Sequence, residues 1–322
     1  IDADQEQSFD DYEELCLQAL DLINAGAISP ADIQSIKDES SDKFDFDLIF
    51  IDEGQDWPQV EADLIKKLYA PEIMCVADGI DQLVRGAATS WDKGVDDVKL
   101  VSLDRCLRLK RNLSVFANEV AKSVGLNWNV KPNKDAGGGR VILLTRPFME
   151  YPDLQSELIE AAKSKGNAEI DFLYCVPSSN IREHEGGRQS KLVHSFISNG
   201  YEVWDGTDPL TRKDFPHRLS QLRVVQYASC RGLEGWTVIL EGLDDYWSEE
   251  CSLHVHPADN SDEIPSFVNS GKAASDFAWQ KVLIPFTRPI DTLVISLADI
   301  DSVCSQALLD LASLLPEIIE VK

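Results

Sequence analysis

The chain has 322 residues, which predicts about two domains, and its 43% hydrophobic content is enough for packed cores and argues against wholesale disorder. No apolar run approaches the ~20 residues of a membrane-spanning helix, so we expect no membrane partner. The net charge of −26 makes the chain as a whole a poor binder of nucleic acid, because such affinity normally comes from neutralised phosphates.

The first hundred residues predict helices around one short buried strand. Apolar residues recur at helical spacing from Tyr12 to Ile23, and Ser29-Pro30 has the pattern of a helix start. Residues 48–51 are a short apolar run, typical of a buried parallel strand. A helix over 59–69 and strands over 73–77 and 98–102 are expected next.

The rest of the chain alternates strands with helices. Residues 101–140 are locally basic, with 8 basic and 3 acidic side chains, so a positive stripe can exist on an acidic body. A helix is expected over 112–124 and a turn-rich segment over 131–140. Further strands are expected near 141–145, 170–176, 201–204, 222–227, 237–241 and 292–296, with helices near 153–165, 189–199 and 303–315. This alternation predicts an α/β fold with a mostly parallel sheet covered on both faces.

Acidic residues follow the 48–51 strand directly. Asp52 and Glu53 come first, and Gln55 follows two residues later. The carboxyl ends of strands are where open α/β sheets bind ligands. An Asp at this place can hold a phosphate-bound Mg²⁺, and a neighbouring Glu can orient or deprotonate a water. The pattern indicates nucleotide hydrolysis.

Five segments in order resemble the motifs of the UvrD/Rep-like superfamily 1 helicases. They are Ile51–Asp56, similar to a Walker B strand, Val76–Gln82, Leu103–Arg108, Tyr227–Trp236 and Phe286–Pro289. Each segment alone is a weak signal. Their order, and their positions at expected strand ends or helix starts, make the resemblance specific, and it covers roughly residues 10–300.

The resemblance implies two RecA-like lobes with mostly parallel sheets and ATP in the cleft between them. Residues 1–100 would be an incomplete first lobe, and residues 101–322 the second. It implies the cofactors ATP and Mg²⁺, with Asp52 as the metal-holding and nucleotide-binding carboxylate. It also implies ATP-dependent movement on, or unwinding of, single-stranded or duplex DNA, with RNA as an alternative.

The resemblance assigns roles to further residues. Glu53 would act as general base, and Gln55 and Gln82 would sense the γ-phosphate or its water. Arg108 and Arg288 would neutralise charge on the phosphoryl oxygens. Two further positions, Gly232 and Glu234, would contact the nucleotide, Glu234 at its ribose. The physical basis is phosphoryl transfer, in which catalysis is positioning plus charge stabilisation.

The sequence departs from the family pattern in one decisive place, because it has no Walker A loop. That loop needs Gly, four residues, Gly-Lys and then Ser or Thr. The only Gly-Lys pair is Gly271-Lys272, which Ala273 follows. Without the loop nothing cradles the β- and γ-phosphates. We therefore expect the chain alone to be inactive.

Two explanations stay open for the missing loop. The chain, which begins with Ile1, is either a piece of a longer protein whose upstream part supplies the loop, or a degenerate relative. That missing N-terminal part is then an expected partner. The rival function is a non-catalytic, helicase-like module that binds proteins.

Three smaller features complete the sequence evidence. Trp91 is interpreted either as a buried core residue or as a substitute for the base-stacking aromatics that the family usually has after Gln82. The connection over about 205–222 is short where the family often inserts a helical subdomain. The seven cysteines are scattered, odd in number and without C-x-x-C, which is typical of a reducing cytosol and predicts a cytoplasmic location.

Overall fold

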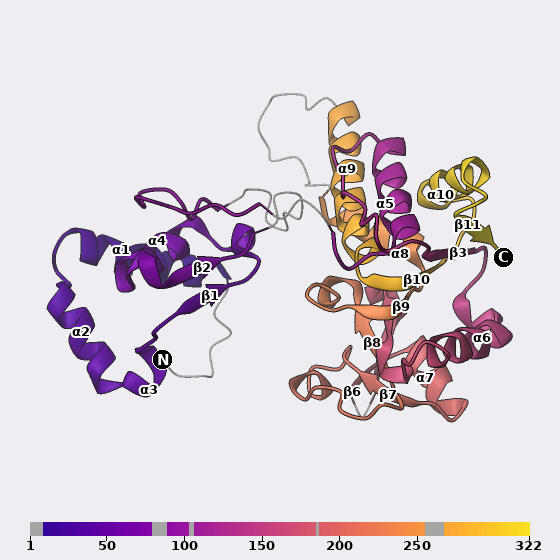
Figure 1. Cartoon of the computed structure of the whole chain (residues 1–322), viewed down its shortest axis with the longest axis horizontal. Coiled ribbons are helices and arrows are strands. Elements are labelled where there is room, and N and C mark those ends of the chain that lie inside the picture. The colour runs from indigo at the N-terminus through magenta and orange to yellow at the C-terminus, as the bar shows by residue number, and fades with distance from the viewer. Residues whose placement is uncertain (1–8, 79–88, 103–105, 185–186, 255–266) are drawn as a thin grey trace. The chain divides into compact units, whose positions relative to one another are not determined.

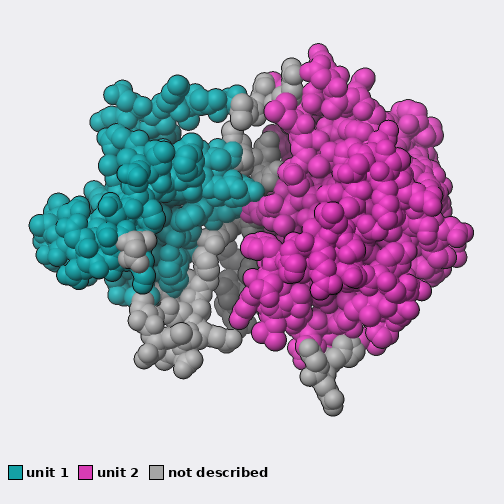
Figure 2. Space-filling model, turned by 60° about the horizontal axis from the view of Figure 1, so that its bottom comes forward, with its two compact units in different colours: residues 1–102 teal, residues 103–322 magenta. Residues whose placement is uncertain are grey.

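A computed structural model describes residues 9–78, 89–102, 106–184, 187–254 and 267–322. The chain divides into two compact units, residues 1–102 (unit 1) and residues 103–322 (unit 2; Figure 2). Each unit is an assembly of strands and helices, and the larger one contains a parallel sheet. The predicted α/β class is therefore confirmed. No helix in the described ranges is long and apolar enough to cross a membrane.

Unit 1 is built mainly from helices (Figure 1). Ser29 begins the second helix with a capping box, since its hydroxyl accepts from the amide of Asp32 and the Asp32 carboxylate accepts from the Ser29 amide at 2.8 Å. This confirms the predicted helix start. The helices are α1 (Phe9–Asn24), α2 (Pro30–Glu39), α3 (Ser41–Phe44) and α4 (Gln59–Leu68).

The sheet of unit 1 has two parallel strands, β1 (Ile49–Ile51) and β2 (Met74–Val76). Ile51 points into a small core with Ala62 and Trp91. Two large apolar side chains on the same segment face solvent instead, Leu48 and Phe50, the latter 75% exposed. The strand expected over 98–102 is wrong, because that segment pairs with no described strand.

Unit 2 contains a seven-stranded sheet in which every neighbouring pair is parallel. The order is β11-β3-β10-β9-β4-β8-β7. The strands are β3 (Arg140–Leu144), β4 (Phe172–Val176), β7 (Glu202–Asp205), β8 (Gln221–Gln226), β9 (Gly235–Leu240), β10 (Pro289–Ser296) and β11 (Ile319–Val321).

Helices cover both faces of this sheet, as its continuous apolar strands require. Helices α5 (Arg111–Ser123), α9 (Phe267–Phe286) and α10 (Val303–Leu314) lie on one side, and α6 (Pro152–Lys163) and α7 (Lys191–Ser198) on the other (Figure 1). Helix α8 (Leu243–His254) packs on α9. Alternate residues of each strand therefore meet different helices.

The core beneath α6 and α7 is rich in aromatic side chains. Tyr174 of β4 stacks edge-on against Phe196 of α7, with ring centroids 4.8 Å apart. Its hydroxyl donates to the side-chain oxygen of Gln155 at 2.7 Å, so this buried polar group is satisfied. Among the described residues, most buried apolar side chains belong to unit 2.

Sequence patterns missed five of the described helices and strands of unit 2. They are α8, α9, β11 and an antiparallel hairpin of β5 (Ile181–His184) and β6 (Gly187–Ser190). The hairpin is polar, so it has none of the apolar alternation that predicts a half-buried strand. Strand β11 has only three residues.

Candidate functional site

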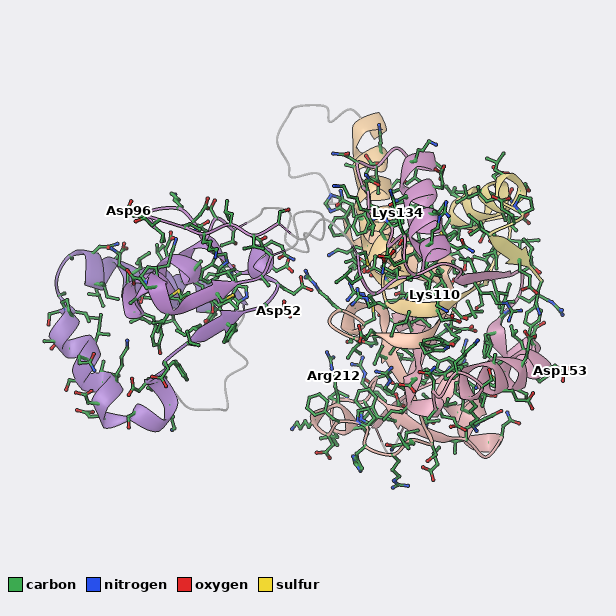
Figure 3. All side chains as sticks on the ribbon, in the orientation of Figure 1. Asp52, Asp96, Lys110, Lys134, Asp153 and Arg212 are labelled. Carbon is green, nitrogen blue, oxygen red and sulfur yellow. The ribbon has the colours of Figure 1, made fainter. Side chains whose placement is uncertain are left out.

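In unit 1 the predicted acidic residues form a tight turn at the carboxyl end of β1, where Figure 3 labels Asp52. The amide of Gly54 donates to the carbonyl of Ala77 at 2.8 Å, directly after β2. A Cβ on Gly54 would lie 2.5 Å from the side chain of Val76. Only glycine therefore lets the turn approach the neighbouring strand this closely.

Glu53 has a left-handed backbone, with φ 51° and ψ 43°. Such a conformation in a residue other than glycine costs about 1–3 kcal/mol and often marks a functional site. The Glu53 amide donates to the carboxylate of Asp52 at 2.9 Å. The turn thus holds the predicted general base in a strained geometry.

Gln55 is 2% exposed and contacts the predicted base directly. Its side-chain nitrogen donates to a carboxylate oxygen of Glu53 at 2.7 Å. The structure therefore brings together two residues to which the motif resemblance gave different roles, Glu53 as general base and Gln55 as a sensor of the γ-phosphate or its water. Gln82, the third, lies outside the described residues.

Trp91 packs against this turn and hydrogen-bonds to it, a role that the sequence did not suggest. Its ring nitrogen donates to the carbonyl of Gly54 at 2.8 Å, and the ring packs on Ile51 and Ala62. Of the two interpretations of Trp91, the buried one is correct. Thr89 adds an amide that donates to the carbonyl of Gln55 at 3.3 Å.

Asp52 is the carboxylate expected to hold Mg²⁺. It is exposed, and no group of three or more His, Cys, Asp or Glu side chains among the described residues could hold a metal ion. Magnesium usually keeps several waters and takes only one or two protein carboxylates together with substrate phosphates. The donor set at Asp52 fits that kind of site and does not fit an all-protein metal cage.

In unit 2 the predicted residues gather at the amino edge of the sheet. Gly235 begins β9, Pro289 begins β10, and these two residues are paired in register. Glu234 and Arg288 precede them, so the fifth and sixth motif-like segments are neighbours. The edge lies opposite to the one where open parallel sheets usually bind ligands.

Arg108 reaches the same edge from the segment before α5. Its guanidinium lies 3.3 Å from the carboxylate of Glu234, a contact between residues 126 positions apart. The Nε of Arg108 is buried and has no hydrogen-bond partner in the described part of the chain. A buried N–H of this kind is costly unless a ligand satisfies it.

Arg223 was not identified from sequence, although it contacts the same cluster. It lies on β8 and donates to the carbonyl of Glu234 at 2.7 Å. Burial lowers the pKa of its guanidinium, and its Nε has no hydrogen-bond partner among the described residues. A charged residue inside the apolar run of β8 was the signal that could have found it.

Arg288 is 3% exposed and is held by its own helix end. Its Nε donates to the carbonyl of Ile284 at 3.2 Å, and a terminal nitrogen donates to the hydroxyl of Thr287 at 2.9 Å. The pKa of the buried Cys230 thiol is lowered mainly by a hydrogen bond with Cys175. The positive charge of Arg288 lowers this pKa further. The arginine therefore makes this part of the edge electropositive.

Gly232 lies in the turn that leads to Glu234. Its φ is 74°, a left-handed value that glycine adopts without strain, and the space around its Cα is open. Within unit 2, Arg108, Gly232, Glu234 and Arg288 thus belong to one edge, together with Arg223. Two guanidinium groups, those of Arg108 and Arg223, contact Glu234 at this edge, each with a buried Nε that has no described hydrogen-bond partner, and such donors suit an anionic ligand.

Comparisons with known proteins add little to this picture. No protein-family model matches the sequence, and no curated protein matches it. One similar solved structure is the C-terminal domain of a possible DNA helicase from Lactobacillus plantarum WCFS1, with 13% identity and a TM-score of 0.38. The match covers 66% of this chain and 97% of that chain. A likeness this weak carries no weight for function.

Proposed function

We propose that the chain is part of an ATP-dependent helicase or translocase that acts on DNA, or alternatively on RNA. The proposal includes a Walker A loop supplied by a further part of the same protein, since this sequence has none. It places the activity in the cytoplasm, as the cysteine pattern predicts. The chain by itself then has no significant ATP hydrolase activity.

The contact between Arg108 and Glu234 is the observation that supports this function most directly. The two residues are separated by 126 positions and were chosen from different motif-like segments, yet their side chains lie 3.3 Å apart. The buried, unpartnered Nε of Arg108 adds a donor that suits an anionic ligand.

In the proposed reaction the γ-phosphoryl group of ATP would pass to water and ADP would leave. On unit 2, Arg108 and Arg288 would bind phosphate oxygens and neutralise their charge, while Gly232 and Glu234 would contact the nucleoside. On unit 1, considered by itself, Asp52 would hold Mg²⁺ and Glu53 would accept a proton from water. Gln55 keeps the Glu53 carboxylate oriented through its 2.7 Å hydrogen bond.

The role of Glu53 is tested by nucleic-acid-stimulated ATP hydrolysis in the protein that includes the upstream coding region. Glu53→Gln removes the proton acceptor and should lower the rate by about 10²–10⁴-fold. Glu72→Gln is the matched control, because Glu72 is an exposed acid of the same unit. Equal rates for Glu53→Gln and the parent would remove Glu53 from its assigned role.

The need for an upstream loop is tested by the chain alone. We expect its ATP hydrolysis to stay at background, with or without nucleic acid, because nothing in it cradles the β- and γ-phosphates. A normal basal rate in purified chain would contradict this expectation.

A second function is favoured by the missing Walker A loop and the net charge of −26. In that case the chain is a non-catalytic, helicase-like module that binds other proteins. The upstream coding sequence discriminates between the two, since a glycine-rich loop ending in Gly-Lys-Thr or Gly-Lys-Ser supports the enzyme. Its absence would leave the binding module.

A further inference from the structure

The connection between β7 and β8, residues 206–220, exposes three large apolar side chains. Leu210, Phe215 and Leu219 all face solvent, and Phe215 is 81% exposed. Single exposed apolar residues are ordinary, whereas three within ten positions mark a surface for interaction. We refer to residues 206–220 as the β7–β8 loop.

Backbone and side-chain hydrogen bonds hold the β7–β8 loop in one shape. The ring nitrogen of Trp204 donates to the carbonyl of Asp214 at 2.7 Å, next to Phe215. On the other side of Phe215, the side-chain oxygen of Gln221 accepts from the amides of His217 and Arg218 at 3.1 and 3.0 Å. Phe215 is thus presented to solvent from a fixed backbone.

Three cationic side chains lie within three positions of the exposed ring, together with the exposed acid Asp214. Arg212 and Lys213 are exposed, and neither makes an ion pair with any residue that the structure describes. Figure 3 labels Arg212 at the rim of unit 2. Arg218 is also exposed and lies 3.4 Å from Glu202. On a chain with a net charge of −26, unpaired cations beside an aromatic ring are a local exception.

The hairpin of β5 and β6 lies beside this surface and carries both bases and acids, with Arg188 3.9 Å from Glu183. Amide and hydroxyl donors of Thr211 and the backbone amide of Arg188 hold the pKa of the Asp208 carboxyl below its usual value. Gly187 approaches the same carboxylate, since a Cβ there would lie 3.2 Å from it. The hairpin therefore lies against the loop, and it carries Arg182, which is exposed and has no described ion-pair partner.

We propose that the β7–β8 loop and the adjoining hairpin bind single-stranded nucleic acid, with Phe215 stacking on a base and Arg212 and Lys213 contacting phosphates. Exposed aromatic rings interleaved with cations bind single strands because every base has a face for stacking. A duplex hides those faces. The surface shares no residue with the Arg108–Glu234 edge and requires no nucleotide; its partner rests on the proposed function, to which it adds a strand-binding site.

Fluorescence anisotropy of a labelled oligothymidylate of about 20 nucleotides, titrated with the full chain without ATP, tests the proposal. Phe215→Ala should weaken binding by about 5- to 100-fold, and Phe215→Tyr should retain it, because tyrosine also stacks. Leu314→Ala, which removes an equally exposed apolar side chain from α10, should bind as the parent does.

The phosphate contacts can be tested by the salt dependence of the binding affinity. Combined Arg212→Ala and Lys213→Ala should reduce the slope of log affinity against log salt by about 1.4, the value for two contacts to a single strand. Lys165→Ala, a change in an exposed cation beyond α6, should leave the slope unchanged. An unaltered slope in the double variant would remove both residues from the contact.

Two competitors distinguish the occupants. A duplex of the same length should compete at least about 10-fold less well than the single strand, because its bases are already stacked. Polyglutamate that displaces the strand at equal charge would indicate an acidic protein segment as the occupant and would overturn the proposal. So would an absence of oligothymidylate binding at about 50 mM salt, or equal affinity for Phe215→Ala and the parent.

These outcomes are independent of ATP hydrolysis. The Glu53→Gln change should leave strand binding without nucleotide unaltered, and Phe215→Ala should leave the Arg108–Glu234 contact intact. Loss of the nucleotide proposal would therefore not remove the strand-binding surface, and the reverse also holds.

Discussion

Unit 1 and unit 2 differ in how completely each buries its strands. In unit 2 the parallel strands are covered on both faces and their apolar residues are buried. In unit 1, as far as its residues are described, the core under the two parallel strands contains Ile51, Ala62 and Trp91, and Phe50 on β1 faces solvent. Parallel sheets normally occur with both faces covered. The difference is that β1 of unit 1 exposes a large apolar side chain, whereas the central strands of unit 2 are buried.

The largest expected change in the free energy of unfolding is in unit 2. Leu173 on β4 is fully buried, and Leu173→Ala should lower the free energy of unfolding of unit 2 by about 2–5 kcal/mol. Hydrogen exchange read by mass spectrometry should show faster exchange in β4, β8 and β9 and no change in β1 and β2. An equal increase in both units would mean that they unfold together and would break the comparison.

A smaller effect is expected from the turn of unit 1. Gly54→Ala places a Cβ 2.5 Å from the side chain of Val76, and the overpacking should destabilise unit 1 by about 1–3 kcal/mol. Exchange should then accelerate in β1 and β2 only. Gly271→Ala is a suitable control because nothing lies within 4 Å of its added Cβ. Unchanged protection of β1 would show that the turn contributes little to the stability of unit 1.

The smallest effect concerns the pH dependence of unit 2. Burial raises the pKa of Glu241, although Ser296 and the amide of Phe148 donate to its carboxylate, and the nearby Asp244 and Asp245 raise it further. Since the folded pKa lies above the unfolded one, Glu241 favours folding most at low pH. That contribution is lost as the pH rises above the ordinary Glu value of about 4.3.

Glu241→Gln removes this titration, so the pH dependence of stability can be compared between the parent and the variant. The parent should lose stability relative to the variant as the pH rises, with urea midpoints of unit 2 as the measurement. A difference between parent and variant that is constant with pH would contradict the assignment.

Much of the fold was predictable because apolar runs report burial. The strands near 141–145 and 170–176 correspond to β3 and β4, whose residues are almost entirely buried. The strand predicted over 98–102 was wrong because Leu100 and Val101 are apolar but strongly exposed. Composition predicts strand propensity and cannot show whether a partner strand exists.

The candidate site was predictable where a short motif carries the chemistry. Glu53 and Gln55 are two residues apart, so their hydrogen bond follows from local geometry. The contacts of Arg223 with Glu234 and of Trp91 with Gly54 depend on how distant segments pack, and no local pattern encodes them. Sequence therefore named the proposed site residues and missed the residues that hold them in place.

The left-handed backbone of Glu53 has a consequence for how natural variants of this protein should distribute. Glycine adopts the same dihedral angles freely, so Glu53→Gly should relieve part of the strain and leave thermal tolerance equal or improved. Selection for folding alone would then drift toward glycine at this position. Persistence of an acid there across natural variants would indicate that the carboxylate is retained for its chemistry, at the expense of stability.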